Sequence, residues 1–310
     1  MIITVTLNPA IDKTVEIDHF ALNAVNRVKA MRTDPGGKGI NVSKVVAALG
    51  GQTVACGLLG GAAGEQIKQA LSAYNVALAF TKAPYETRTN LKIVDRLNRT
   101  NTDVNESGAA VTPELLEAVF STVCAHARPG DTVVLAGKNP PGTPDGLLAS
   151  WVRLFKRQDL RVFVDTVGAP MLRAIEEKPF LIKPNAEELS ELFGRPLEGR
   201  PALLSAAREL NARGVALVVV SLGGGGALFV TSSRALHAHG LKVPVGSTVG
   251  AGDSMTASIA FDLERGKSLE DAARCAVAVS AANVMCSGTQ PAELSAILPL
   301  VPQVELEPLD

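Results

Sequence analysis

Ser247-Thr-Val-Gly-Ala-Gly-Asp-Ser-Met-Thr256 sets a glycine-rich turn directly before an apolar run, residues 255–261, that predicts a helix. Such a turn points free backbone N–H groups at one spot, where the helix dipole adds positive potential. An anionic phosphoryl group fits that spot, and Asp253 in the first turn can hold a hydroxyl group beside it. The segment therefore suits phosphoryl transfer to an alcohol, and the alternative is that its glycines merely shape a strand-to-helix turn.

A second glycine cluster, Asp34-Pro-Gly-Gly-Lys-Gly39, precedes residues 40–49, whose apolar spacing is helical and which end at Gly50-Gly51. This helix start also offers free N–H groups, here with Lys38 among them. The combination suits an anionic or polyhydroxy ligand. If the cluster is only a tight turn, Lys38 is instead a solvated side chain.

The composition indicates a soluble globular protein with a sizeable core, since the chain has 310 residues and 46% of them are hydrophobic. The net charge of −1 argues against nucleic acid or an acidic membrane as the main partner. The 4 cysteines form no Cys-x-x-Cys pair, so neither disulfides nor a thiolate zinc site is expected. The N-terminal segment does not resemble a signal peptide and no apolar run reaches about 18 residues, so we expect a cytoplasmic location.

Strand-like and helix-like segments alternate, which predicts an α/β fold with a mainly parallel central sheet, helices on both faces and one domain over residues 1–310. The expected strands are residues 2–7, 53–58, 131–136, 161–165, 180–182 and 215–222, with antiparallel additions at 227–231 and 235–239. The expected helices are residues 64–74, 112–126, 145–155, 186–193, 201–213, 252–265 and 269–285, with a short helix after residue 291.

Residues 13–33 and 87–105 break this alternation, because their apolar and polar residues alternate as in half-exposed strands. We expect them to form a small sheet beside the main domain, acting as a lid or a dimer surface. The alternative is that they extend one edge of the main sheet.

Several other functions lack their motifs. The sequence has no Walker-type phosphate loop, no dinucleotide fingerprint after the first strand and no Gly-x-Ser-x-Gly elbow. A nicotinamide dehydrogenase is thereby excluded. Of the four histidines only His237 and His239 are near each other, and their spacing on an apparent strand is typical of an exposed face rather than a metal site.

Lys183-Pro-Asn-Ala-Glu-Glu188 follows a buried strand, so Asn185 would cap a helix and Glu188 would face the same crevice one turn later. This pair would suit a magnesium ion held through water. A purely structural capping box between the same two residues is the alternative. Asp12, shortly after the first strand, lies at the same expected edge of the sheet, where ligands bind in open α/β sheets.

Four stretches taken together resemble the ribokinase-like PfkB carbohydrate kinase family. They are Gly36-Gly-Lys-Gly-Ile-Asn-Val42, Lys183-Pro-Asn-x-x-Glu188, Ser221-Leu-Gly-Gly-Gly-Gly-Ala227 and Ser247-Thr-Val-Gly-Ala-Gly-Asp253. The resemblance covers essentially the whole chain. It implies a three-layer αβα fold, a small β-sheet lid built from about 13–33 and 87–105, and a homodimer formed through the lids.

Thr6-Leu-Asn-Pro-Ala-Ile-Asp12 and Thr87-Arg-Thr-Asn-Leu-Lys92 are similar to the branch of the family that phosphorylates phosphosugars. The resemblance implies ATP as the phosphoryl donor, Mg²⁺ and a ketohexose monophosphate as acceptor. Fructose 1-phosphate is the first expectation, with fructose 6-phosphate and tagatose 6-phosphate as alternatives. A sugar-phosphate or nucleotide sensor without activity is disfavoured, because the intact Gly250-Ala-Gly-Asp253 includes a catalytic base that a binding module does not need.

The resemblance also implies a role for each matching residue. Asp253 would be the base, and the N–H groups of Gly250, Ala251 and Gly252 would form the anion hole. Expected substrate ligands are Asp12 and Asn41 for sugar hydroxyls, Lys38 and Arg88 for the existing phosphate, and Gly37, Asn90 and Lys138 beside them. Expected ATP ligands are Asn185, Ser221, Gly223, Gly224, Gly225, Gly226, Thr248 and Gly252, with Glu188 holding magnesium through water.

One segment departs from the pattern of the branch. Gly137-Lys-Asn-Pro-Pro-Gly142 stands where Gly-Ser-Leu-Pro-x-Gly is usual, so Lys138 replaces a small hydroxyl side chain near the substrate phosphate. Its charge would strengthen phosphate binding, or its length would alter which sugar phosphate fits.

Overall fold

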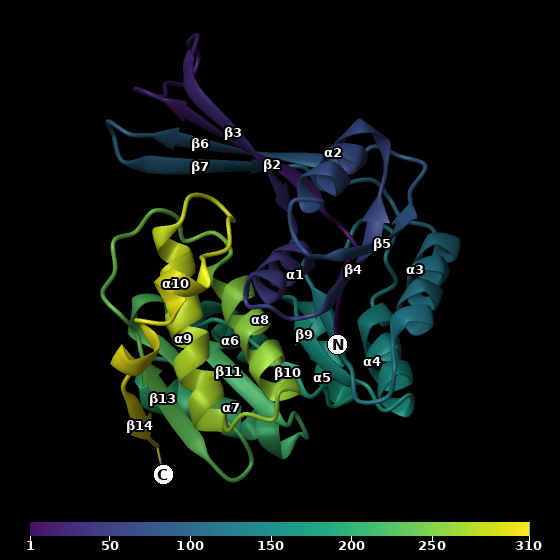
Figure 1. Cartoon of the computed structure of the whole chain (residues 1–310), viewed down its shortest axis with the longest axis vertical. Coiled ribbons are helices and arrows are strands. Elements are labelled where there is room, and N and C mark those ends of the chain that lie inside the picture. Colours follow the sequence, from purple (N-terminus) through teal and green to yellow (C-terminus); the bar gives the residue numbers. More distant parts are fainter. Residues whose placement is uncertain (310) are drawn as a thin grey trace.

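The computed structural model describes residues 1–309 and is built around a ten-stranded sheet with the order β14-β13-β12-β11-β10-β9-β8-β1-β4-β5 (Figure 1). Neighbouring strands from β11 to β5 are parallel, whereas β12, β13 and β14 extend one edge in antiparallel fashion. The strands are β1 (Ile2–Thr6), β4 (Thr53–Leu59), β5 (Ala77–Lys82), β8 (Thr132–Ala136), β9 (Arg161–Asp165), β10 (Leu181–Ile182), β11 (Leu217–Ser221), β12 (Gly226–Val230), β13 (Ala235–His239) and β14 (Leu306–Pro308).

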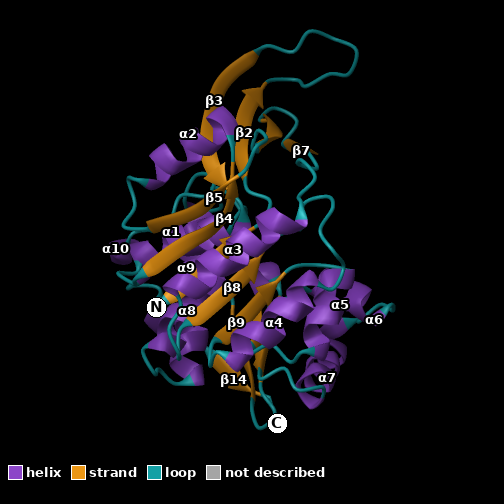
Figure 2. Ribbon diagram, turned by 90° about the vertical axis from the view of Figure 1, so that its right-hand side faces the viewer, coloured by secondary structure: helices purple, strands orange, loops and turns teal. Residues whose placement is uncertain are grey.

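Helices cover both faces of this sheet and appear on either side of its strands in Figure 2. They are α1 (Lys38–Ala48), α2 (Gly61–Leu71), α3 (Pro113–His126), α4 (Leu147–Arg157), α5 (Ala169–Glu176), α6 (Ala186–Phe193), α7 (Gly199–Ala212), α8 (Ala251–Glu264), α9 (Leu269–Met285) and α10 (Leu294–Ile297). Within residues 1–309, none of them combines the length and hydrophobicity that crossing a membrane requires.

The central strands are apolar on both sides because each face of the sheet is buried. Successive side chains of a strand point to opposite faces, so Ile2 and Ile3 of β1 enter different cores. The core around Ile3 contains side chains from α3, α4, α5, α6 and α7. The core around Ile2 contains side chains from α1, α8, α9 and α10, which places α1 and α8 side by side on one face.

A second, four-stranded sheet has the order β3-β2-β6-β7 and projects from one end of the molecule (Figure 1). It consists of β2 (Ala10–Ile17), β3 (Val28–Gly36), β6 (Arg88–Asp95) and β7 (Thr100–Asn105). Strands β2 and β6 are parallel, and the other two pairs are antiparallel. The chain passes from β1 into β2 through Asn8 and Pro9, so the small sheet is joined directly to a central strand.

The predicted α/β fold with a mainly parallel sheet and a small additional sheet is confirmed. The alternative, in which these segments extend the main sheet, is wrong because the two sheets are separate. Strand β2 begins earlier than predicted, at Ala10, and this places Asp12 within the small sheet rather than in a loop.

Three elements were not predicted: β5, α5 and β14. Strand β5 is a half-exposed edge strand, α5 is short and begins with a proline turn, and β14 has three residues, so none carries a strong local pattern. Helix α2 begins at Gly61 instead of residue 64, because the carboxylate of Glu86 accepts hydrogen bonds from the N–H groups of Ala62 and Ala63. Because Glu86 lies 24 residues after Ala62, the sequence around the start of α2 does not reveal this cap.

Candidate active site

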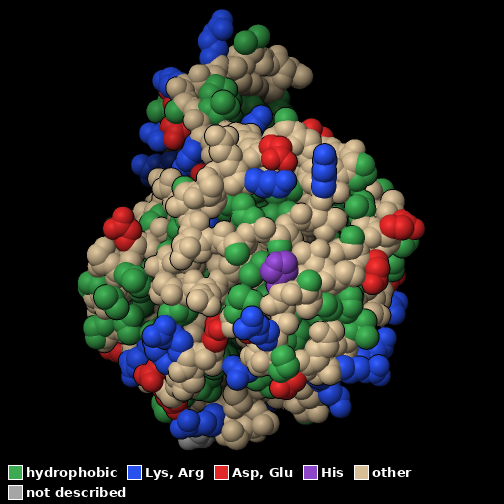
Figure 3. Space-filling model, turned by 45° about the vertical axis from the view of Figure 1, so that its right-hand side comes forward, with side chains coloured by type: hydrophobic (Ala, Val, Ile, Leu, Met, Phe, Trp, Pro, Cys, Tyr) green, Lys and Arg blue, Asp and Glu red, His purple; other side chains and the backbone are tan. Residues whose placement is uncertain are grey.

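A cleft of about 480 Å³ lies at the carboxyl edge of the main sheet, below the small sheet. Both sheets and the starts of α1 and α8 contribute to its walls. Lys and Arg side chains gather along the projecting small sheet (Figure 3). The lining residues are Thr6, Asn8, Asp12, Gly37, Lys38, Asn41, Arg88, Asn90, Gly137, Lys138, Lys183, Asn185, Glu188, Ser221, Val249, Gly250, Gly252 and Asp253.

Helix α8 starts at this cleft with the predicted glycine-rich turn. Gly250 precedes the helix with φ of 81°, a left-handed conformation that favours glycine. The N–H group of Ala251 is directed at the carbonyl oxygen of Thr248, at a long 3.4 Å. A Cβ atom on Gly252 would lie 2.9 Å from Lys183 Nζ, so the missing side chain lets this ammonium group approach the helix start.

Asp253 is buried in the first turn of α8. Its Oδ2 atom accepts a hydrogen bond of 2.8 Å from Asn41 Nδ2 on α1, which ties the two glycine-started helices together. Burial, followed by the nearby Asp165 carboxylate, raises the pKa of Asp253. A carboxylate with a raised pKa accepts a proton more readily, which is what a general base requires.

Asp165 is a buried carboxylate at the end of β9 that the sequence analysis missed. Its Oδ1 atom lies 2.7 Å from Lys38 Nζ, and its Oδ2 atom lies 3.2 Å from Lys183 Nζ. Burial by itself would raise the pKa of Asp165, but the two ammonium groups hold that pKa at about 2. An acid at the carboxyl end of a predicted strand was the available signal.

The same contacts change the interpretation of Lys38. Burial favours a lower pKa for Lys38, but the Asp165 and Asp253 carboxylates raise that pKa above its ordinary value. The side chain is therefore a charged part of the cleft floor rather than a solvated lysine, and its partner is a carboxylate of the protein.

Residues of the small sheet form the opposite wall. Asp12 on β2 and Asn90 on β6 are direct neighbours in the parallel register, and Asn90 Nδ2 donates to Asp12 Oδ1 at 2.8 Å. Burial raises the pKa of Asp12. Arg88 donates to Asn90 Oδ1 at 3.2 Å and to the carbonyl oxygens of Asn8 and Glu106, so its guanidinium group is held in place at the cleft.

The predicted nucleotide residues are only partly gathered in this cleft. Asn185 and Glu188 line it and also form the complete capping box, with hydrogen bonds of 2.8 and 2.9 Å. Ser221 lies beside Asn185 through a parallel bridge. The exposed turn η1 (Gly223–Gly225), the following Gly226 and Thr248 lie outside the set of residues that lines the cleft.

Thr248 instead lines a neighbouring hollow of about 590 Å³ between the small sheet and the loops around residues 245–249 and 287–289. This hollow shares Asp12, Asn90 and Val249 with the cleft, so the two adjoin each other. Lys138 is exposed at the rim of the cleft.

The open parallel sheet, the two glycine-started helices at its carboxyl edge and the buried Asp253 between them define a small-molecule kinase of the ribokinase-like fold. The chain belongs to the pfkB family of carbohydrate kinases, whose family model matches residues 5–296. The phosphotransferase class predicted from the sequence is thereby confirmed.

Relatives match nearly the whole chain. A 1-phosphofructokinase of Rhodobacter capsulatus is 40% identical over 280 residues, which cover 90% of this chain and 89% of that protein. A 1-phosphofructokinase of Escherichia coli is 32% identical and covers 99% of this chain and 98% of that one. The crystal structure of phosphofructokinase-2 from Escherichia coli in complex with substrates and products superposes with a TM-score of 0.93 at 31% identity, covering 98% and 99% of the two chains.

Lys44 on α1 lies behind the site and is 1% exposed. Its ammonium group donates to Thr289 Oγ1 at 2.9 Å and to the carbonyl oxygen of Pro35 at 3.3 Å. Burial lowers the pKa of Lys44 from 10.5 to about 8, although Asp34 and Asp253 act in the opposite direction.

Lys44→Met should remove a pH-dependent contribution to stability. Because the folded protein releases this proton near pH 8 and the unfolded chain near pH 10.5, the unfolded chain binds more protons between these values, and stability rises with pH there. Relative to the variant, the wild-type free energy of unfolding should rise by roughly 2 to 3 kcal/mol from pH 7 to pH 10, measured by urea denaturation. A difference that is constant with pH, or one shared by the half-exposed control Lys68→Met, would contradict this.

Proposed function

We propose that this chain transfers the γ-phosphoryl group of ATP to the free primary hydroxyl of fructose 1-phosphate, giving fructose 1,6-bisphosphate and ADP. The observation that carries the proposal is the buried Asp253, held by Asn41 in the first turn of a glycine-started helix. The substrate follows the relatives, several of which are named 1-phosphofructokinase and match this chain over most of its length. An ATP-dependent kinase of this kind is expected in the cytoplasm.

Asp253 would accept the proton of the attacking hydroxyl group. The hydrogen bond from Asn41 occupies Oδ2 and leaves Oδ1 for the hydroxyl. The buried Oδ1 atom of Asn41 has no hydrogen-bond partner among the described residues, so it is available to accept from a second hydroxyl group of the sugar. Asp12 on the facing sheet would hold a further hydroxyl.

The moving phosphoryl group would be stabilised by positive potential that is already in place. The positive end of the α8 dipole lies at the cleft, which Gly250 and Gly252 line, and the N–H groups of Gly250, Ala251 and Gly252 would donate to the phosphoryl group once the long contact of Ala251 with Thr248 gives way. The ammonium groups of Lys38 and Lys183 lie at the floor of the cleft, where both pair with Asp165, and they would attract the phosphoryl oxygens. Positioning and charge stabilisation of this kind account for most of the catalysis in phosphoryl transfer.

The phosphate already present on the sugar would bind Arg88, with Gly37, Asn90 and Lys138 beside it. Arg88 is already oriented by two backbone carbonyl groups, so little side-chain freedom is lost on binding. Lys38 would contribute mainly through its charge, because its ammonium group is paired with Asp165.

ATP would occupy the side of the cleft lined by Asn185 and Ser221 and extend beyond it toward the turn at Gly223–Gly226, with Thr248 contacting it from the neighbouring hollow. The donor set there fits Mg²⁺, since one oxygen of Glu188 is engaged in the capping box and the other is not. Magnesium usually keeps several waters and takes one or two carboxylates together with phosphate oxygens. Glu188 would hold the ion through water, and the ion would screen the charge of the ATP phosphates.

Asp253→Asn should abolish turnover while ATP still binds, because the amide keeps the size of the side chain but cannot take a proton. We expect kcat to fall by a factor on the order of 10² to 10⁴ in a coupled assay of ADP release with fructose 1-phosphate. Calorimetric ATP affinity should stay near that of the wild type. The matched control is Asp159→Asn, which makes the same change at an exposed turn. A near-normal kcat in Asp253→Asn would show that Asp253 is not the base.

Lys138→Ser should weaken sugar-phosphate binding, because an exposed ammonium group beside a phosphate contributes up to about 1 kcal/mol. We expect KM for fructose 1-phosphate to rise roughly two- to fivefold with kcat little changed, and Lys68→Ser to have no effect. The kcat/KM values for fructose 1-phosphate, fructose 6-phosphate and tagatose 6-phosphate should be compared in the wild type and in the variant. An unchanged KM and sugar preference would contradict the role of Lys138, and a wild-type preference for another sugar would contradict the proposed substrate.

We also propose that the small sheet is a lid and that two copies dimerise through it. Apolar side chains project from the β2–β3 connection and from β3, with Leu22 83%, Val25 84% and Met31 64% exposed. A second copy would cover them, and a related phosphofructokinase-2 from Escherichia coli has been solved in a tetrameric inhibited form.

Val25→Asp should place a charge in that interface and shift the protein toward the monomer, because an unpaired buried carboxylate is strongly unfavourable. Mass should be followed by light scattering over a concentration series. The control is Leu298→Asp, which changes an exposed apolar residue at the end of α10, outside the small sheet, and should leave the dimer intact. A wild-type monomer, or a Val25→Asp dimer of unchanged affinity, would rule out this interface.

A further inference from the structure

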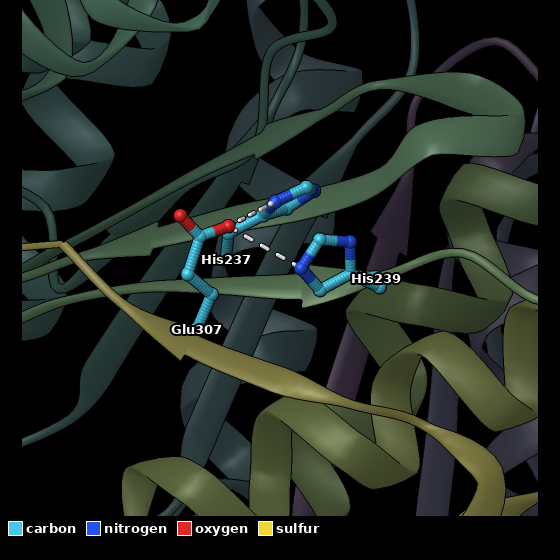
Figure 4. A group of neighbouring side chains, drawn as sticks. All are labelled: His237, His239 and Glu307. Atoms are coloured by element: carbon cyan, nitrogen blue, oxygen red, sulfur yellow. Dashed lines mark ion pairs between the residues drawn. The ribbon is translucent and has the colours of Figure 1, made fainter.

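Three side chains converge at the antiparallel edge of the main sheet (Figure 4). His237 and His239 project from the same side of β13, and Glu307 projects between them from β14. Their ligand atoms all lie within 4.8 Å of one another. The spacing of the two histidines favoured an exposed strand face, but His237 is only 7% exposed. The third residue, Glu307, was missed because it lies opposite His237 on β14, a strand that was not predicted.

The separations of Glu307 from the two histidines match those of a tetrahedral metal site, and the two histidine nitrogens lie within 4.8 Å of each other. Glu307 Oε2 lies 3.5 Å from His237 Nδ1 and 3.3 Å from His239 Nε2. Two ligands placed at 2.0–2.2 Å from Zn²⁺ at the tetrahedral angle are about 3.4 Å apart. Small rotations of the half-exposed His239 and Glu307 side chains toward the buried His237 would bring the three ligand atoms to bonding distance.

The tautomer of His237 is suited to metal binding. Its Nε2 atom lies 2.8 Å from the carbonyl oxygen of Gly225 and can only donate to it, so the proton is on Nε2 and the Nδ1 lone pair faces the cluster. A metal-bound histidine commonly donates its other N–H group to a backbone carbonyl in this way.

Arg200 at the start of α7 already supplies a cation to these atoms. Its Nη1 atom lies 3.0 Å from His237 Nδ1 and also contacts Glu307 Oε2. The side chain is half-exposed and can swing into solvent. The lone pairs of His237 Nδ1 and Glu307 Oε2 are thus already directed at the guanidinium group of Arg200. A metal ion that binds these atoms would have to displace that group.

We propose that His237, His239 and Glu307 form a binding site for a divalent transition-metal ion of the Zn²⁺ type, for which Arg200 competes. Water would complete the tetrahedron, and the half-exposed His239 and Glu307 leave an entry path. The site lies at the antiparallel edge of the sheet, and no residue in it was assigned to the proposed catalytic reaction. Through His237 it contacts the turn at Gly225.

Zinc titration calorimetry of the chelator-treated protein tests this, with the visible spectrum of bound Co²⁺ reporting tetrahedral geometry. We expect one Zn²⁺ per chain, and affinity reduced on the order of tenfold or more in His239→Ala and in Glu307→Gln. Arg200→Ala should bind more tightly than the wild type, and this gain cannot arise from misfolding. His126→Ala, which removes an exposed histidine on α3, should bind like the wild type.

Absence of stoichiometric binding would overturn the proposal. So would full affinity in His239→Ala or Glu307→Gln, which would place the ion elsewhere, for example on a cysteine. Affinity in Arg200→Ala that is equal to or below that of the wild type would show that the guanidinium group and the metal do not share the same lone pairs.

Discussion

The Asp165 carboxylate between Lys38 and Lys183 is the interaction on which the rest of the site depends. It joins the end of β9 to the first residue of α1 and to the ammonium group that lies against Gly252 of α8. Without it, two ammonium groups would be left near two positively polarised helix starts in a poorly solvated place, which is costly. The Asp165 carboxylate thus allows two ammonium groups to lie beside the two helix starts, where the proposed phosphoryl transfer would use them.

The same pairing explains why the two acids of the site have different protonation behaviour. Asp165 is paired with two ammonium groups and has a pKa of about 2, whereas the side chain of Asp253 accepts a hydrogen bond from the amide of Asn41 and has a raised pKa. The carboxylate that stays charged pairs with the two ammonium groups at the floor, and the carboxylate with the raised pKa is the one proposed as the base. The two aspartates thus differ in pKa because their surroundings differ.

The sequence allowed the parallel sheet, the small sheet and both glycine-started helices to be predicted, because apolar periodicity and glycine clusters are local signals. Asp253, Asn41 and Asn185 were assigned through motifs of the same kind. The Lys38–Asp165 pair spans 127 positions, so its existence follows only from the folded sheet. Glu86 at the start of α2 and Glu307 beside the two histidines were missed for the same reason.

The direct connection from β1 into β2 bears on whether ATP is hydrolysed by water or transfers its phosphoryl group to the sugar. Asp12 and Asn90 are part of the small sheet, whereas Asp253 and the α8 turn belong to the main body. If the small sheet tilts as one body about Asn8 and Pro9, the sugar-holding groups and the phosphoryl-holding groups align only when it is down. A sugar phosphate that contacts both the small sheet and the α8 turn would favour the aligned position of the small sheet. A water molecule is too small to contact both and would not favour it. Discrimination against futile hydrolysis would then be a property of the connection between the sheets.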